Sequence, residues 1–329
     1  MKEHLKTGYY FLQKILRKDA GLLQKIRRER LVTVLNLHQI SPHENPFWSP
    51  LKPEIFDDLL FFLKETFEVV PFREIEETKS EKPLAVLSFD DGYYNFYEFA
   101  APLLKKHGLS ANMNIIPSCV ESGEPMWNIK LYDFLNSAPK KLIDEIALPG
   151  FEARLTGESF AAKVQYGLKI SRFLKNRPRL EREELWRQIE ELINNSDSPQ
   201  TRMMNREEIK EIAELHEIGV HSFSHESMEF ETDAFFEADF EKCADYFKDN
   251  LGLPLEIYAF PNGSYRAEQI TALQKKGIKH VLLVGEDYAS REENVFPRFT
   301  IYGSSKLETR FQALGFNRKN ADQRANRAR

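Results

Sequence analysis

Short apolar runs rich in β-branched residues alternate, from residue 31 onward, with longer amphipathic segments of helical period. The runs predict strands buried on both faces, at residues 31–37, 67–71, 84–89, 112–116, 219–221, 257–260 and 281–284. The segments between them predict helices at residues 53–65, 94–106, 205–216, 232–250 and 267–275. Repeated strand, helix, strand order indicates parallel pairing, in a closed barrel or an open doubly wound sheet. We favour an α/β barrel, because candidate functional residues follow several successive strands.

Residues 125–204 interrupt this order and predict a helical insert. They contain helix-like runs at 129–146, 160–174 and 182–194, with loop signals at 148–150 and 196–199, and no convincing strand. Because the insert follows the strand at 112–116, we expect it to rise over the face where the strands end. It can serve as a lid or substrate-binding element, or as a structural or oligomerising insert.

The charge of the chain is unevenly distributed around a net value of −5. Residues 1–30 hold nine Lys and Arg against three Asp and Glu, and residues 318–329 hold five against one. Apolar side chains recur at helical spacing in the first segment, which predicts a basic amphipathic helix over 1–30. Such a helix can make peripheral contact with an anionic membrane, or dock on the barrel domain, residues 31–317, with its basic face in solvent. We expect the tail, 318–329, to be disordered.

Composition excludes several classes of protein. A hydrophobic fraction of 42% in 329 residues excludes a disordered chain, and an acidic body argues against nucleic-acid binding. The two cysteines, Cys119 and Cys243, lie far apart and predict buried free thiols rather than a disulfide framework. The N-terminal segment lacks an uninterrupted apolar core, and no segment has the length of a membrane span. We therefore expect a cytoplasmic protein.

Polar residues that can take part in catalysis or metal binding follow three of the predicted strands. Asp90-Asp91-Gly92 follows residues 84–89; alone, it is as typical of a turn as of an active site. His221 and His225 follow residues 219–221, and imidazoles four residues apart can bind one ion together with a carboxylate, a donor set that suits zinc or another divalent first-row metal. The rigid turn Pro261-Asn262-Gly263 can direct a backbone N–H into the same cavity.

These residues resemble the polysaccharide deacetylases of carbohydrate esterase family 4. Ser88-Phe89-Asp90-Asp91-Gly92 matches the first family motif, S/T-F-D-D-G, and the segment 221–225 (HSFSH) matches the second, H-S/T-x-x-H. Residues 260–263 (FPNG) are similar to a Y-P-Y-G turn found in one branch, and residues 37–38 with 56–70 are similar to the opening of that branch. The resemblance covers roughly residues 31–124 and 205–304, so the insert and both ends lie outside it.

The resemblance implies a distorted (β/α) barrel of about seven strands and hydrolytic removal of an N-acetyl group, occasionally an O-acetyl or N-formyl group, from a sugar. It assigns a divalent metal, with zinc as the expected ion, to Asp91, His221 and His225. It makes Asp90 the general base that takes a proton from water. The backbone N–H of Asn262 would help to stabilise the oxyanion.

The chain also departs from the family pattern at two points. Ala259 occupies a position where many members have an arginine that orients the base, and Arg298 is our candidate replacement. Most members use a late histidine as general acid, yet no histidine follows His280. We assign the acid role to His38, which ends the first predicted strand; the alternative is a structural histidine that caps the strand.

The resulting hypothesis is a metal-dependent hydrolase that removes an N-acetyl group from a cytoplasmic sugar or glycan precursor. One alternative is a deformylase of a lipid-linked amino sugar, which the basic ends would suit. Another is a catalytically inactive carbohydrate-binding scaffold of the same fold, which the departures would explain.

Overall fold

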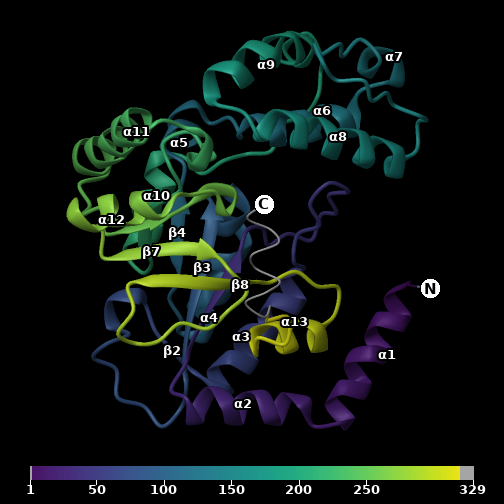
Figure 1. Ribbon diagram of the computed structural model, residues 1–329. Helices are drawn as coiled ribbons and strands as arrows, with labels where there is room; N and C mark the ends of the chain where they lie inside the picture. Colours follow the sequence, from purple (N-terminus) through teal and green to yellow (C-terminus); the bar gives the residue numbers. More distant parts are fainter. Residues whose placement is uncertain (1, 319–329) are drawn as a thin grey trace.

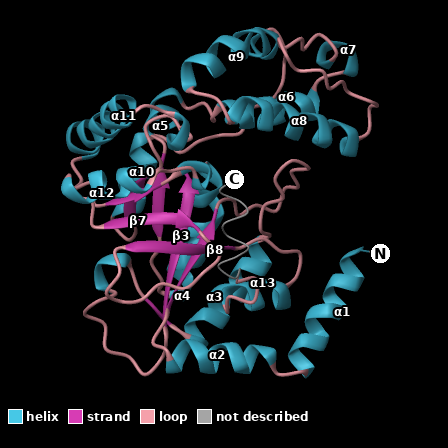
Figure 2. Ribbon diagram, viewed as in Figure 1, coloured by secondary structure: helices cyan, strands magenta, loops and turns pink. Residues whose placement is uncertain are grey.

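The computed structural model describes residues 2–318, and its centre is a closed barrel of parallel strands (Figures 1 and 2). Seven strands form the ring in the order β1-β8-β7-β6-β5-β4-β3, and β1 pairs with β3 to close it. They are β1 (Val32–Leu37), β3 (Leu84–Asp91), β4 (Asn112–Ile115), β5 (Glu217–Val220), β6 (Ile257–Ala259), β7 (His280–Val284) and β8 (Val295–Thr300). The predicted barrel is confirmed.

One strand of the ring was not predicted, and one predicted strand lies outside it. The run at 67–71 forms only β2 (Glu68–Val69), which pairs with β3 beside the ring. The ring is instead completed by β8, in which Pro297 pairs with Leu283 of β7. Proline removes a backbone donor and is rare inside a sheet, so its presence obscured the strand pattern.

The predicted helices cover the barrel with small shifts of boundary. They are α3 (Pro53–Thr66), α4 (Ala101–His107) after a π-helical turn at Phe96–Ala100, α10 (Arg206–Ala213), α11 (Asp233–Tyr246) and α12 (Ala267–Lys275). Two further helices, α5 (Pro117–Ser122) and α13 (Lys306–Ala313), were not predicted. Cys119 and Cys243 are free and buried.

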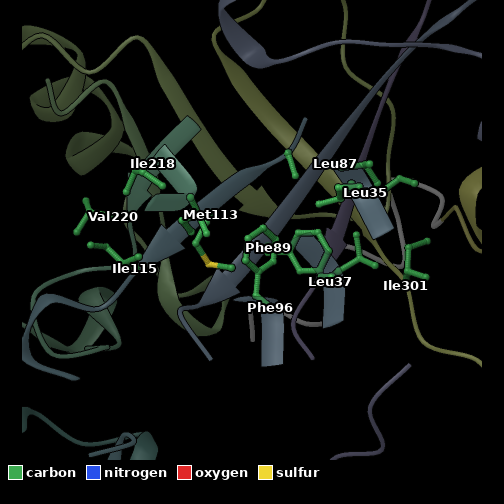
Figure 3. Close-up of a cluster of buried hydrophobic side chains, with 14 of the residues drawn as sticks. Leu35, Leu37, Leu87, Phe89, Phe96, Met113, Ile115, Ile218, Val220 and Ile301 are labelled. Carbon is green, nitrogen blue, oxygen red and sulfur yellow. The ribbon is translucent and has the colours of Figure 1, made fainter. Parts of the chain in front are cut away.

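Alternation along the strands separates two faces. Outward side chains pack against the helices; for example, the ring of Phe89 in β3 meets the ring of Phe96, in the π-helical turn before α4, edge to face at 4.8 Å (Figure 3). Inside the barrel, the beginnings of the strands contribute apolar residues such as Val34, Val86 and Phe296. Further along the same inward face the residues become polar, and all of these are buried: Asn36, Ser88, Asp90, Asn114 and Arg298. The polar layer therefore lies at the carboxyl ends of the strands.

The insert forms a helical layer over one end of the barrel (Figure 1, teal). It comprises α6 (Trp127–Ser137), α7 (Lys140–Ile143), α8 (Phe160–Lys175) and α9 (Arg179–Asn194), with a core of its own that includes Leu131, Phe134, Ile170 and Ile189. Pro139 separates α6 from α7, so the run predicted at 129–146 is two helices. Phe47, in the loop after β1, stacks on Tyr132 at 4.7 Å and joins this core to the barrel.

The N-terminal segment forms two helices where one was expected, α1 (Lys2–Ile15) and α2 (Lys18–Arg28). The chain turns between them at Arg17, which has a φ of 55°. Tyr10 packs against Phe311 of α13 at 5.6 Å, which attaches α1 to the body. Among residues 2–318, no helix is both long and apolar enough to cross a membrane. The tail expected to be disordered lies outside the described residues except for Arg318.

Candidate active site and metal centre

One carboxylate and two imidazoles meet at the carboxyl ends of β3 and β5. The Nε2 atoms of His221 and His225 lie 3.6 and 3.7 Å from Oδ1 of Asp91. The two rings are 5.0 Å apart, and all three side chains are buried. One ligand atom from each residue falls within 4.8 Å of the others, so the three can bind a single ion.

The Asp91 carboxylate fits a cation for two reasons. Its buried Oδ1 atom has no hydrogen-bond partner among the described residues, although buried polar atoms are almost always paired. Burial and the neighbouring Asp90 carboxylate raise the pKa of Asp91 to about 8. A divalent ion between Asp91 and the imidazoles would compensate this buried charge.

The orientation of His221 also suits metal binding. Its Nδ1 atom lies 2.8 Å from the carbonyl oxygen of Ala259, so the Nδ1–H donates there and the Nε2 lone pair faces Asp91. Burial lowers the pKa of both His221 and His225, which keeps the rings neutral. A neutral imidazole is the form that binds a metal.

The backbone around these ligands is strained. Asp91, His225 and Asn262 have φ values of 80°, 60° and 58°. These lie in the left-handed region, which residues other than glycine rarely adopt. Conformations of this kind persist only where the surrounding structure holds them, and they are frequent at active sites. Here they turn the chain at the ends of three strands, so that the side chains face one cavity.

Asp90 forms a two-bonded ion pair with Arg298. Nη1 and Nη2 of the arginine donate to its two carboxylate oxygens at 2.8 and 2.7 Å, and Arg298 is completely buried. Burial alone would raise the pKa of Asp90, but the charge and hydrogen bonds of Arg298, together with the nearby imidazoles of His221 and His38, hold the pKa below its usual value. Asp90 is therefore ionised at neutral pH. Thus β8 brings Arg298 to the carboxylate of Asp90. In the family pattern an arginine at position 259, which is alanine here, would orient that carboxylate.

Asn114, which the sequence analysis missed, also holds Asp90. Its Nδ2 donates to Asp90 Oδ1 at 2.8 Å and to Ser88 Oγ at 3.2 Å. A Cβ atom at Gly219 would lie 2.3 Å from Asn114 Oδ1, so glycine leaves the room that this amide occupies. Asparagines at 112 and 114 inside an otherwise apolar strand were a signal that could have been used.

His38 and Asn262 line the same cavity as Asp90, Asp91 and the two histidines. The His38 ring lies 5.1 Å from the ring of Trp48, and loss of solvent lowers the pKa of His38 to about 4. The Asn262 side chain donates to Ser227 Oγ at 3.0 Å, which braces the turn at Pro261–Gly263. Six of the seven candidate residues thus line one cavity of about 220 Å³, and the seventh, Arg298, binds Asp90 without lining it.

The cavity includes residues of the insert that no motif indicated. Met126 precedes α6, Asn128 and Ile129 lie in α6, and Lys175 ends α8. Trp48, from the loop after β1, completes this side. The sequence carried no signal for these residues, because their place depends on how the insert sits on the barrel.

Comparison with known proteins agrees with this site. The family model for polysaccharide deacetylases matches residues 77–281, a span that includes both carboxylates and both motif histidines. The chain belongs to the polysaccharide deacetylase family. The resemblance noted in the sequence is thus confirmed. No curated protein sequence matches the chain.

Several solved structures share the fold of this member of the family. The deacetylase PplD of Streptococcus pyogenes, in complex with acetate, is 17% identical, with a TM-score of 0.57 over 86% of this chain and 98% of that one. IcaB from Ammonifex degensii is 15% identical, with a TM-score of 0.54 over 86% and 97% of the two chains. BC0361, a polysaccharide deacetylase from Bacillus cereus, is 14% identical, with a TM-score of 0.54 over 86% and 69%. At these identities the likeness concerns the fold.

Proposed function

We propose that this member of the family is a metal-dependent hydrolase that removes an N-acetyl group from a sugar or glycan precursor. The observation that carries the proposal is that two adjacent carboxylates lie in different electrostatic environments. Asp91 has an unpartnered oxygen beside two neutral imidazoles, whereas Asp90 is held ionised by Arg298. Two such groups whose pKa values are pushed apart are typical of distinct catalytic roles.

Asp91, His221 and His225 would hold the metal, and the donor set of one oxygen and two nitrogens suits zinc. When bound, the ion supplies Lewis-acid chemistry: it lowers the pKa of water and polarises the substrate carbonyl. The carbonyl of Ala259 fixes the ring of His221 for this role through the hydrogen bond to Nδ1.

Asp90 acts as the general base in this proposal. Its ionised carboxylate accepts the proton of the attacking water, while Arg298 and Asn114 keep it oriented. The backbone N–H of Asn262 donates to the substrate oxygen as negative charge develops there. The strained turn at Pro261–Gly263 lies beside the same cavity and supplies this group.

His38 is the proposed general acid for the leaving amine. Its pKa of about 4 keeps the ring neutral in the free protein, so it can donate only after it has gained a proton. Negative charge that develops on the substrate favours the protonated ring, since an opposite charge nearby raises the pKa of an imidazole. In this proposal His38 gains a proton from solvent and donates it to the amine nitrogen as the C–N bond breaks, and Asp90 later releases the proton of the attacking water to solvent.

The exposed face of α1 supports contact with a membrane. Tyr10 turns inward, whereas Phe11, Leu12 and Ile15 are 60%, 51% and 61% exposed, and Leu16 is 56% exposed. Lys14, Arg17 and Lys18, which are close to these residues in the sequence, are exposed too. An apolar face with a basic rim suits an anionic lipid surface, such as the inner leaflet of a cytoplasmic membrane. We infer a protein of the cytoplasm that associates peripherally with that leaflet, where it would meet lipid-linked sugars.

The test of the reaction is release of acid from a panel of N-acetylated and N-formylated sugars, before and after removal of metal by a chelator. We expect acetate release that the chelator abolishes and zinc restores, and that Asp90→Asn loses. Release of formate alone would favour the deformylase. Zinc binding without any release from the panel would favour the inactive scaffold.

A further inference from the structure

Lys175 carries a positive charge from the insert into the cavity of the proposed active site. It is the last residue of α8, and its Nζ donates to Oδ1 of Asn262 at 2.9 Å. Asn262 in turn belongs to the turn that follows β6. The side chain therefore reaches from the insert to the barrel and lines the cavity that His38 and Trp48 also line.

No carboxylate pairs with this ammonium group among residues 2–318. The charged neighbours of Lys175 include Arg172, of like sign, and burial together with Arg172 lowers its pKa. Its charge also contributes to the lowered pKa of His225, after burial and His221, which places it near the metal ligands. A half-buried ammonium usually has an anionic partner, and the amide oxygen of Asn262 satisfies only one of its three N–H groups.

The other charges of the cavity do not compensate Lys175. Asp90 and Arg298 neutralise each other through their ion pair. The single negative charge of Asp91 would neutralise only one of the two positive charges of the divalent ion that it would help to bind. The cavity of the loaded protein thus keeps an excess of positive charge, to which Lys175 adds away from the proposed reaction centre.

We propose that Lys175 binds a phosphoryl group attached to the same sugar whose acetamide is hydrolysed. The proposal rests on the proposed function and names its substrate class: a phosphate-bearing amino sugar rather than a neutral glycan. An ammonium is a compact point charge that suits a tetrahedral phosphoryl group, whereas planar carboxylates favour the guanidinium fork of arginine. A cavity of about 220 Å³ is small and fits a single sugar unit better than a long chain.

The phosphoryl group can belong to a sugar phosphate, a nucleotide sugar or a lipid-linked sugar pyrophosphate. The test therefore compares N-acetylglucosamine with its 1-phosphate, its uridine diphosphate ester and a short-chain lipid pyrophosphate derivative. The full chain is used as wild type, Lys175→Met, Lys175→Arg and the control Lys169→Met, an exposed lysine of the same helix. Kinetics of acetate release and calorimetric binding of the 1-phosphate are both measured.

We expect Lys175→Met to raise KM for the phosphorylated sugars by about tenfold or more, the loss typical of one charged hydrogen bond. KM for the neutral sugar should change much less, Lys175→Arg should recover part of the loss, and Lys169→Met should match wild type. The phosphorylated substrate with the lowest KM identifies the source of the group. Calorimetry should show the same loss of affinity for the 1-phosphate in Lys175→Met.

Three outcomes separate this inference from the proposed reaction. Equal KM values for neutral and phosphorylated sugars in wild type, unaltered by Lys175→Met, would overturn the phosphoryl site and leave the hydrolase standing. Equal losses of kcat on all substrates would also overturn it, because they would make Lys175 only a support for Asn262. Binding of the 1-phosphate that depends on Lys175, without acetate release from any substrate, would sustain the site and reject the hydrolase.

Discussion

Arg182 of the insert and Glu226 of the loop after β5 form a buried ion pair beside His225. Two hydrogen bonds join them, at 2.5 and 2.9 Å, and their side chains are 7% and 1% exposed. Arg179 adds a bond of 3.3 Å to Ser224 Oγ, on the other side of the histidine. The loop that carries a proposed metal ligand is thus fastened to the insert, and we expect the two to be energetically coupled.

Breaking this pair should destabilise the protein and weaken metal binding. Arg182→Met would leave the buried Glu226 with only the longer contact to Arg179, at 3.8 Å, so we expect a loss of at most about 3–5 kcal/mol, the range typical of an unpaired buried charge. Glu226→Gln should cost less. In the double variant the two losses should not add, because both substitutions break the same ion pair. Urea unfolding and zinc titration measure the two effects, with Arg187→Ala, exposed on α9, as the control. Additive losses, or unchanged zinc affinity, would show that the insert does not support the loop.

Loss of Arg298 should move the pH dependence of the reaction. Burial would raise the pKa of Asp90, and the Arg298 guanidinium, through its charge and hydrogen bonds, is the main group that opposes that shift. In Arg298→Met the pKa of Asp90 rises, so the base is protonated at higher pH and the acid limb of kcat/KM moves to higher pH. Arg298→Lys keeps the charge but not the two-bonded geometry, and should move the limb less. An acid limb at the same pH in all three proteins would separate Arg298 from the function of Asp90.

A methyl group at position 219 should displace Asn114. Gly219→Ala places a carbon 2.3 Å from Asn114 Oδ1 and 2.9 Å from Ile257 Cβ. We expect a loss of about 1–3 kcal/mol in the free energy of unfolding, as for other overpacked sites, and a lower kcat because Asp90 loses a donor. Gly157→Ala is the control, since a Cβ there would meet no atom within 4 Å. Wild-type kcat in Gly219→Ala would indicate that Asn114 does not position the base.

Asp239 should make stability depend on pH. It lies in α11 and accepts the backbone N–H of Phe223, and burial raises its pKa to about 7 despite that bond. The folded pKa exceeds the ordinary value of 3.8, so the contribution to stability is complete below about pH 4 and is lost as pH rises toward 7.

Asp239→Asn removes this titration. Relative to wild type, the variant should therefore gain stability between pH 4 and 8, by on the order of 4 kcal/mol at most. Urea unfolding of the metal-free proteins across this range measures the gain. Asp245→Asn, exposed on the same helix, should show none. A difference between Asp239→Asn and wild type that stays constant with pH would contradict the assignment.

The exposed face of α1 should bind anionic vesicles. Sedimentation with phosphatidylglycerol vesicles should pull down the wild type, whereas neutral vesicles or high salt should not. Replacement of Lys14, Arg17 and Lys18 by glutamine should weaken binding by about a hundredfold, from roughly 1 kcal/mol for each charge. Serine at Phe11, Leu12, Ile15 and Leu16 should abolish it, with Leu180→Ser, exposed on α9, as the control. Self-association through this face, without vesicle binding, would instead identify a dimer contact.

Local patterning predicted the alternating strands and helices of the barrel, apart from β8, and the two segments that carry the proposed metal ligands. Strand and helix periods depend on neighbours a few residues apart, so they can be recognised in the sequence without knowledge of the fold. Because parallel strands end at the same edge of a barrel, residues at those ends could be expected to converge, as Asp91 and His221 do. The family resemblance added the roles, which remain predictions.

The contacts that complete the site depend on the folded chain. Arg298 and Asp90 are 208 residues apart, and only the closure of the ring by β8 joins them. Lys175 reaches Asn262 across 87 residues, from an insert outside the family motifs. Pairings of this kind leave no period or spacing in the sequence, because they arise from packing between elements whose order along the chain says little about their distance in space.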